Sequence, residues 1–180
     1  MMKNMQWFVR ETINRYVDAT VHALDMTMGN GHDTLYLAKR AKKVSAFDVQ
    51  SAALDATKVR LEPYHFTHVA LYHASHEDFQ AYIDEPYGFV MFNCGYLPGS
   101  DKTLTTQAHV TANTLQKAYA GLSVPGAIVL TLYKQHSGAK EELQMVHDRA
   151  LTLPHARLSS YRFLQQQDAP EVLLIEKLSE

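Results

Sequence analysis

The chain has 180 residues, of which 46% are hydrophobic, and this suits one globular domain of ordinary size. Its formal net charge of −2 lacks the basic excess of proteins that bind long stretches of nucleic acid non-specifically, so any RNA contact must come from a local patch. No apolar run approaches the ~18 residues of a membrane span, and residues 1–17 show no signal-peptide pattern. A single cysteine excludes an internal disulfide, and together these features predict a cytoplasmic protein.

Strand and helix patterns alternate along the chain after an N-terminal helix within residues 1–18. Helices are expected where helix-forming residues recur between breakers, and strands where short apolar runs lie between turn residues. The other expected helices are 33–43, 50–62, 76–83, 103–122 and 140–151. The expected strands are 21–27, 44–49, 69–74, 87–93, 127–133, 157–164 and 171–178.

This alternation predicts an α/β fold with a seven-stranded, mostly parallel, Rossmann-like sheet and helices on both of its faces. Pro125 and Gly126 are expected to form the turn that precedes the fifth strand. No helix separates the last two strands, so they are expected to form an antiparallel hairpin at one edge, turning at residues 168–170. We expect one domain over residues 1–180.

The stretch between the first strand and the next helix is the strongest signal for a ligand. In doubly wound sheets the ligand lies beyond the C-terminal ends of the strands. Gly29 and Gly31 form a turn after the first strand, where small residues let a backbone approach a ligand closely. Asp48 follows the second strand, at a separation typical of an acid that binds a ribose diol.

Two further acids near this turn argue against a dinucleotide. Asp25 and Asp33 would repel the pyrophosphate of NAD or FAD. S-adenosylmethionine instead carries a sulfonium and an ammonium, which carboxylates attract, and one carboxylate that N–H groups at a helix start can bind. The pattern therefore favours S-adenosylmethionine as cofactor. The alternative is an ordinary strand–helix turn in which Asp33 caps the helix.

A second motif follows the fourth strand. Asn93 and Tyr96 have the N-x-x-Y spacing of amino-methylating enzymes of the N-P-P-Y type. An asparagine carbonyl oxygen can accept an amine N–H and aim the nitrogen lone pair at a methyl group, and an aromatic ring can stack on a base. The alternative is a surface loop after a core strand.

Four segments, residues 25–38, 47–50, 92–102 and 132–142, together resemble the YtqB/MnmM family of class I methyltransferases, long described as rRNA methylases. The resemblance covers nearly the whole chain and implies the class I methyltransferase fold. It also implies transfer of a methyl group from S-adenosylmethionine to the 5-aminomethyl group of the wobble (2-thio)uridine, in the anticodon stem-loop of tRNA. The product would be methylaminomethyl-(2-thio)uridine.

The resemblance carries over to individual positions of this sequence. The cofactor-binding candidates are Asp25, Thr27, Gly29, Asn30, Gly31, His32, Asp33, Thr34, Asp48, Gln50, His76, Glu77 and Asn93. The catalytic candidates are Asn93, Tyr96, Asp33 and His136. The substrate-binding candidates are Gly95, Tyr96, Leu97, Pro98, Gly99, Asp101, Lys102, Lys134 and His136. The segment around His136 lacks glycines expected in the family, which leaves the detailed role of this histidine open.

Other reactive residues are expected to have no such role. Four histidines between His65 and His76 fall on a loop, a strand and a strand end, so they should not converge, and we expect no metal site. Cys94 beside the acceptor site raises the alternative of a covalent nucleophile for pyrimidine methylation, but Asn93 and Tyr96 already account for the loop as an amine site. The run from Lys39 to Lys43 is a candidate for a local RNA contact, and the alternative is a solvated helix end favoured by the helix dipole.

Two functional alternatives stay open at this point. One is a methyltransferase that acts on rRNA or a small-molecule amine, and the other is a cofactor-binding module without catalysis. A homodimer is one way in which so small an enzyme can extend its RNA surface, and the sequence leaves the oligomeric state open. We expect no membrane partner.

Overall fold

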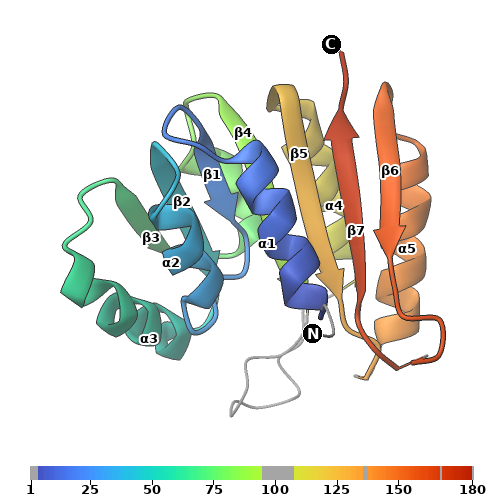
Figure 1. The fold of residues 1–180 in the computed structure, drawn as a ribbon, viewed down its shortest axis with the longest axis horizontal. Coiled ribbons are helices and arrows are strands. Elements are labelled where there is room, and N and C mark those ends of the chain that lie inside the picture. Colours follow the sequence, from blue (N-terminus) through green and yellow to red (C-terminus); the bar gives the residue numbers. More distant parts are fainter. Residues whose placement is uncertain (1–3, 95–107, 136–137, 167, 180) are drawn as a thin grey trace.

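The computed structural model describes residues 4–94, 108–135, 138–166 and 168–179 (Figure 1). The α-helices are α1 (Met5–Tyr16), α2 (His32–Ala38), α3 (Ser51–Leu61), α4 (Ala108–Ala120) and α5 (Ala139–Leu151). Two 3-10 helices, η1 (Glu62–Tyr64) and η2 (His76–Ala81), follow α3 and β3. The strands are β1 (His22–Asp25), β2 (Lys43–Asp48), β3 (Val69–His73), β4 (Tyr87–Cys94), β5 (Leu122–Leu132), β6 (Ala156–Tyr161) and β7 (Glu171–Lys177).

All seven strands form one sheet in the order β3-β2-β1-β4-β5-β7-β6. The first five strands pair in parallel, whereas β7 runs antiparallel to both β5 and β6. The α/β class, the mostly parallel sheet and the C-terminal antiparallel hairpin are therefore confirmed. β6 is the edge strand, and β7 is inserted between it and β5.

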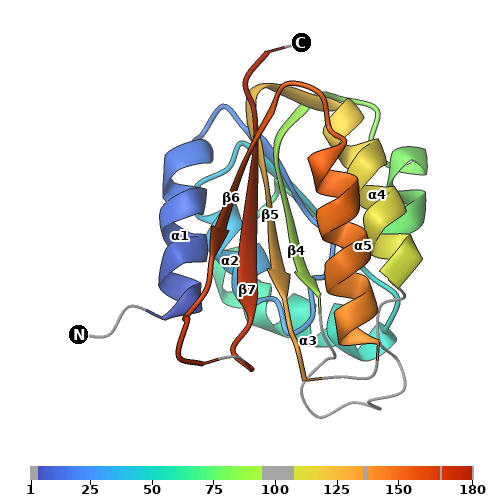
Figure 2. The same cartoon turned by 90° about the vertical axis from the view of Figure 1, so that its right-hand side faces the viewer.

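Helices cover both faces of the sheet, as expected. Figures 1 and 2 show α1, α2 and α3 on one face, and α4 and α5 on the other. α4 also packs against η2 on that second face. Among the described residues, no helix is long and apolar enough to cross a bilayer.

The sheet separates two hydrophobic cores because successive strand residues point to opposite faces. Ala23 and Met91 pack with α1 and α2, whereas Leu24 and Phe92 pack with α4 and α5. β1 and β4 are thus buried on both faces, which explains the nearly continuous apolar run of β4.

Two elements differ from the sequence-based expectation. β5 begins at Leu122, so Pro125 and Gly126 lie within the strand and form no turn before it; the register with β4 shifts there, between Tyr87 and Phe89. Such an irregularity accommodates a proline, which cannot donate to the ladder. The helix expected at 76–83 is the short 3-10 helix η2.

The N-terminal helix α1 is docked across the middle of the sheet. Asn4 caps its start by accepting a hydrogen bond from the Trp7 backbone N–H, and its residue Ile13 is fully buried in the core between the helix and the sheet. At its end, the Tyr16 hydroxyl donates to the buried carboxylate of Glu176 on β7, which Arg157 on β6 also binds. α1 therefore contacts β5 and β7, the strands on one side of the site described next.

Candidate functional site

Three of the sequence-predicted residues lie at the C-terminal ends of parallel strands, which form the lower edge of the sheet in Figure 1. β1 lies between β2 and β4, so the strand order reverses there and leaves a crevice beyond the strand ends. Asp25 ends β1, Asp48 ends β2, and Asn93 lies one residue before the end of β4.

Asp25 is almost fully buried beneath the glycine turn. Its carboxylate accepts a hydrogen bond from the Thr34 hydroxyl at 2.6 Å and one from the Thr27 backbone N–H at 3.2 Å. Burial raises the pKa of Asp25 to about 7. Asp25 and Thr34 are buried against each other beneath the turn, and their expected place at the cofactor stays a prediction.

The glycine turn is fixed by contacts with α3. Gly31 has φ +74, and a Cβ there would lie 2.7 Å from the Thr57 Oγ1 atom, so only glycine fits. The Thr57 hydroxyl donates to the Gly29 carbonyl at 3.1 Å, and Arg60 Nε donates to the Asn30 carbonyl at 2.5 Å. Because both carbonyl groups accept hydrogen bonds from α3, the turn is fixed on α3 and holds the start of α2 next to the crevice.

Asp48 joins this turn to the end of β2. Its two carboxylate oxygens each accept one backbone N–H, from Gly29 at 3.0 Å and from Gln50 at 3.0 Å. The side chain is half-buried, and a carboxylate has lone pairs for further donors. Asp48 is therefore held in a fixed orientation with capacity for the two hydroxyls of a ribose.

Asn93 is the best-defined polar group of the site. Its backbone N–H donates to the Thr27 hydroxyl at 2.7 Å, and its side-chain Nδ2 donates to Asp33 Oδ2 at 3.2 Å. A carboxylate only accepts, so this contact fixes which end of the amide is nitrogen. The Asn93 Oδ1 atom is buried and has no hydrogen-bond partner within the described part of the chain.

Asp33, the partner of Asn93, has a raised pKa. Burial is the main cause, while the hydrogen bond from Asn93 and the charges of His32 and Arg10 act in the opposite direction. A carboxylate of raised pKa beside an unused carbonyl oxygen can take up a proton from a nearby amine.

Asn93 and Asp33 line a narrow cavity of about 50 Å³. α1 supplies one wall through Met5, Gln6 and Val9, and Tyr133 at the end of β5 supplies another. Burial and the charge of Asp33 raise the pKa of Tyr133. The sequence analysis missed Tyr133 and the α1 residues as parts of the site. The position of Tyr133 at the end of a strand could have indicated its place at this edge of the sheet. The pattern of the N-terminal residues did not indicate that α1 lines the cavity.

A wider hollow of about 650 Å³ adjoins this cavity. Tyr133 and Pro170 line both the cavity and the hollow. The amides of Gln135, Gln165 and Gln166 line the hollow but not the cavity. The hollow lies between the end of β5 and the turn from β6 to β7, and its polar amide groups suit a ligand that forms hydrogen bonds.

Several sequence candidates do not reach the crevice with their side chains. His76 is buried against α4, where its Nδ1 lies 3.2 Å from the Thr114 hydroxyl oxygen, and burial lowers its pKa to about 4. The expected place of His76 near the cofactor stays a prediction. The Lys134 ammonium lies 3.9 Å from the Glu171 carboxylate, so it is turned toward β7.

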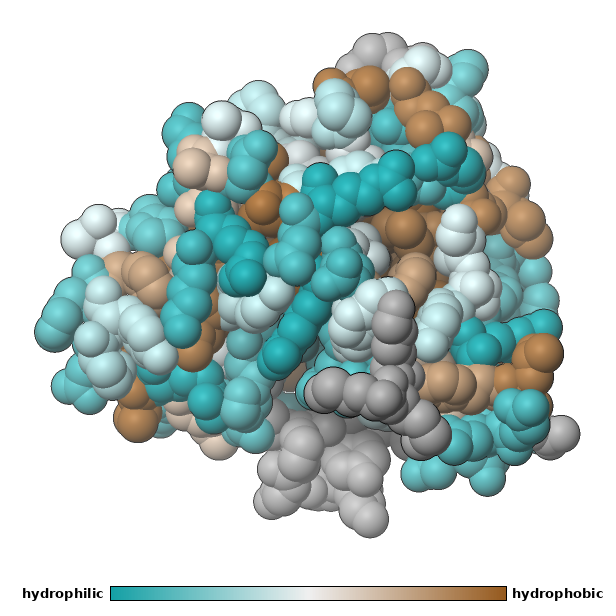
Figure 3. Space-filling view, in the orientation of Figure 1, coloured by the Kyte–Doolittle hydropathy of each residue, from teal (hydrophilic) through white to brown (hydrophobic). Residues whose placement is uncertain are grey.

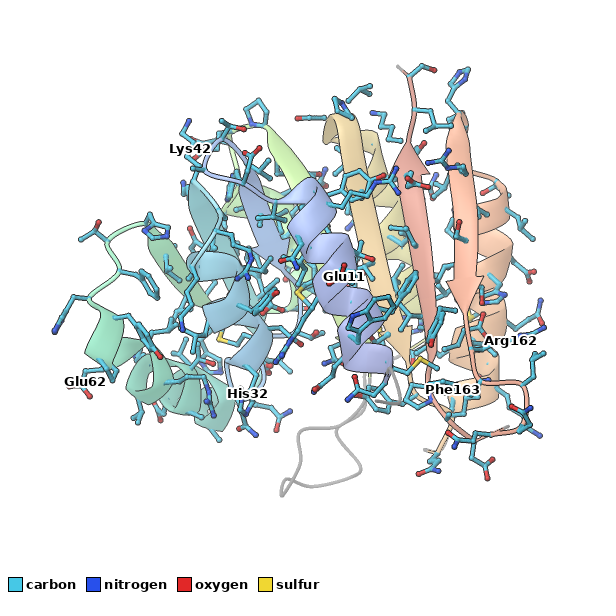
Figure 4. All side chains as sticks on the ribbon, in the orientation of Figure 1. Glu11, His32, Lys42, Glu62, Arg162 and Phe163 are labelled. Carbon is cyan, nitrogen blue, oxygen red and sulfur yellow. The ribbon has the colours of Figure 1, made fainter. Side chains whose placement is uncertain are left out.

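The remaining candidates lie around the crevice or outside the described residues. His32 is exposed at the end of α2 nearest the glycine turn (Figure 4), and the half-buried Glu77 follows β3. The expected substrate and catalytic residues that lie outside the described residues are Gly95, Tyr96, Leu97, Pro98, Gly99, Asp101, Lys102 and His136.

Cys94 is unsuited to the alternative role of a nucleophile. The thiol is fully buried in the core that faces α4 and α5, and burial raises its pKa well above the ordinary value. Among the described residues, no group of histidines, cysteines and acids is placed to hold a metal ion.

A glycine turn after β1, an acid after β2, and a polar end of β4 on this strand order define a class I methyltransferase fold, for which S-adenosylmethionine is the indicated cofactor. The chain belongs to the family described as "Putative rRNA methylase", whose model matches residues 44–177. This agrees with the resemblance seen in the sequence.

Three relatives illustrate the family. A protein of Arabidopsis thaliana described as "tRNA (mnm(5)s(2)U34)-methyltransferase, chloroplastic" is 32% identical over 145 residues; these are 73% of this chain but 53% of the plant protein, so the match spans about half of it. A "putative rRNA-methylase" from Clostridium thermocellum superimposes with a TM-score of 0.94 at 29% identity, covering 99% of this chain and 100% of the other. A "putative methyltransferase" from Streptococcus mutans in complex with SAH superimposes with a TM-score of 0.92 at 32% identity, with the same coverage.

Proposed function

We propose that this chain is an S-adenosylmethionine-dependent N-methyltransferase that methylates the 5-aminomethyl group of the wobble (2-thio)uridine in tRNA. The observation that carries the proposal is the buried Oδ1 atom of Asn93, which has no hydrogen-bond partner among the described residues and belongs to a residue held by Asp33 and Thr27. A primary amine is a donor that satisfies such an atom. The name of the plant relative supports the choice of acceptor.

The residues of the crevice fit the cofactor. The carboxylate of Asp48 is oriented for a ribose diol, and backbone N–H groups at the start of α2 can bind the carboxylate of the cofactor. The turn itself, residues 26–31, contains no lysine or arginine that could bind a pyrophosphate. When bound, S-adenosylmethionine supplies a methyl group on a sulfonium, which a nucleophile can displace.

In the proposed mechanism, Asn93 Oδ1 accepts an N–H bond of the amine and thereby orients the nitrogen lone pair. Asp33 receives the proton that an aminomethyl group must lose before it is nucleophilic, and its raised pKa suits that task. The apolar side chains of Met5 and Val9 exclude water from the cavity and disfavour the charged form of the amine. Positioning then accounts for most of the rate.

The roles expected of Tyr96, Lys102 and His136 stay predictions, as does a second subunit. The wide hollow beside Tyr133 offers room for the nucleoside that carries the amine. A stacked pyrimidine there would place its 5-substituent toward the cavity that Tyr133 shares with Asn93.

The proposal is tested by nucleoside mass spectrometry of tRNA incubated with the purified chain and S-adenosylmethionine. The tRNA should come from cells that install the aminomethyl group but do not methylate it. We expect aminomethyl-(2-thio)uridine to be converted to its methylated form. A chain that binds the cofactor but leaves every tRNA nucleoside unchanged would contradict the proposal, and rRNA or small amines would then be tested as acceptors.

A further inference from the structure

Two helices carry matched rows of polar side chains away from the cavity. On α1, Gln6, Arg10 and Asn14 follow one another at four-residue spacing, so they lie one turn apart along one side of the helix. Gln6 is the member of this row that lines the cavity. The row therefore begins at the proposed acceptor site and runs outward.

The row on the neighbouring helix begins at the same place. On α2, Asp33 lines the cavity, Tyr36 lies one turn farther along, and Arg40 follows just after the helix ends. The charge of Arg10 lowers the pKa of Asp33, so Arg10 lies within electrostatic range of the cavity. The two rows thus form one surface, which we name the α1–α2 seam: Gln6, Arg10 and Asn14 with Asp33, Tyr36 and Arg40.

Two guanidinium groups of the seam share one aromatic ring. The Arg40 Cζ atom lies 3.7 Å from the Tyr36 ring centroid, and the Arg10 Cζ atom lies 5.1 Å from it. Asn14 Oδ1 accepts hydrogen bonds from the Tyr36 hydroxyl at 3.0 Å and from Arg40 Nε at 3.0 Å. Arg40 Nη1 also donates to the Tyr36 carbonyl at 3.0 Å, so the Arg40 side chain is held in one orientation.

This arrangement places two positive charges close together, and the acid of the seam, Asp33, acts on Arg10 through its charge without forming an ion pair with it. Within the described ranges, no carboxylate forms an ion pair with Arg10 or Arg40. By contrast, Arg157 on β6 is neutralised by Glu176. Like charges gathered on one ring repel each other, and a phosphate group would relieve that repulsion while accepting the remaining N–H donors.

The seam lies on an open face of the molecule. Arg10 is exposed, and hydrophilic side chains cover the front of α1 and α2 in the space-filling view (Figure 3). Because the chain as a whole has a net charge of −2, RNA cannot be held by a general positive field. A local pair of oriented guanidinium groups beside the acceptor cavity supplies the attraction that the whole chain lacks.

We propose that Arg10 and Arg40, held on the Tyr36 ring, bind backbone phosphates of the RNA next to the nucleotide whose amine enters the cavity. This inference rests on the proposed function, because it assigns the path of the substrate. The planar guanidinium groups contact phosphate oxygens without reading a base, so they position the RNA and leave its selection to the pocket.

The test measures binding of fluorescently labelled, unmodified tRNA to the full chain by anisotropy, at several salt concentrations between about 50 and 200 mM. Arg10→Gln and Arg40→Gln should each raise Kd about tenfold at low salt and reduce the slope of log Kd against log salt by about 0.7 to 1. In methyl-transfer assays the same variants should raise KM for tRNA while kcat stays nearly constant. Arg149→Gln, an equal charge change on α5 behind the sheet, should alter none of these values.

Arg10→Gln is the decisive variant, because within the described part of the chain it gives up a contact with the Tyr36 ring and no ion pair, so its folding should be unaffected. Unchanged Kd and salt slope in both variants, or an equal loss in Arg149→Gln, would overturn the assignment. If the wild-type chain binds tRNA through these arginines but methylates no nucleoside, the phosphate contacts stand and the proposed function fails. If it methylates tRNA and the variants match the wild type, the proposed function stands and the phosphate contacts fail.

Discussion

The two ends of the Asn93 amide have different environments. Its nitrogen is bound to Asp33, whereas its oxygen is buried without a partner in the described part of the chain. A buried polar atom left without a hydrogen bond costs about 1–3 kcal/mol, so this atom is expected to gain a donor in the complex with substrate. The cost falls on the free protein, and the gain is available when the amine binds.

Replacing Asn93 by Ala should therefore lower kcat by roughly 100- to 1000-fold, because the amine loses the acceptor that orients it. The affinity for S-adenosylmethionine should stay nearly constant, and it can be measured by calorimetry beside the methyl-transfer rate. Asn113→Ala, an exposed asparagine on α4, is the matched control and should keep full activity. Equal rates in the two variants would show that Asn93 has no part in the reaction.

Asp25 links the site to the stability of the protein. Its pKa is raised by burial to about 7, whereas a carboxyl in the unfolded chain ionises near pH 4. Between these values the unfolded state releases a proton that the folded state keeps, so stability should fall as the pH rises through this window.

The Asp25→Asn variant lacks this proton and should be insensitive to pH at that position. Its free energy of unfolding relative to the wild type should rise by about 2 to 3 kcal/mol between pH 5 and pH 8. Urea unfolding at both pH values measures the difference. Asp55→Asn, on the exposed side of α3, is the control, and a similar rise there would rule out Asp25 as the cause.

At the scale of elements, the turn between β1 and α2 depends on its contact with α3. Both Gly31, before α2, and Gly138, before α5, precede a helix with positive φ, at +74 and +81. They differ in their surroundings, because a Cβ at Gly31 meets Thr57, whereas no described atom lies within 4 Å of one at Gly138.

Gly138→Ala should therefore cost only the backbone term, about 1 kcal/mol. Gly31→Ala should cost about 2 to 4 kcal/mol, because the clash with Thr57 adds to that term, and it should also weaken cofactor binding. Chemical denaturation and calorimetry compare the two variants. Equal losses of stability in the two variants would mean that the close contact between Gly31 and Thr57 of α3 does not restrict the residue at position 31.

The order of elements was predictable because helix and strand patterns alternate clearly along this chain. Strand ends were enough to bring Asp48 and Asn93 to one edge, since parallel strands end together, and Asp33 follows on the helix after the first of these strands. The direction of single side chains was not predictable: Asp25 and His76 occupy the expected edge but point inward. The wall formed by α1 depends on long-range docking, which local sequence patterns do not encode.

At the scale of the whole molecule, the cofactor site joins the sheet to two helices on one of its faces. Asp48 comes from the sheet, the turn leads into α2, and α3 closes behind it. A ligand that binds only this assembled state stabilises every element that contributes to it.

S-adenosylmethionine at about 100 times its Kd should add about 2.7 kcal/mol to the free energy of unfolding, or roughly 5–10 °C in Tm. NAD should give no shift, since the acids near the turn repel its pyrophosphate. Asp48→Asn should remove most of the shift. Thermal unfolding with each ligand checks these outcomes, and stabilisation by NAD equal to that by S-adenosylmethionine would contradict the cofactor assignment.

The docking of α1 has a consequence for biosynthesis. The helix is made first, yet it packs against β7, and Tyr16 contacts Glu176 across 160 positions of the chain. While residues 171–177 are still in the ribosome, strands β1 to β5 can pair, but α1 lacks the part of its docking surface that β7 supplies. The wall of the acceptor cavity should therefore be completed only after synthesis has passed β7.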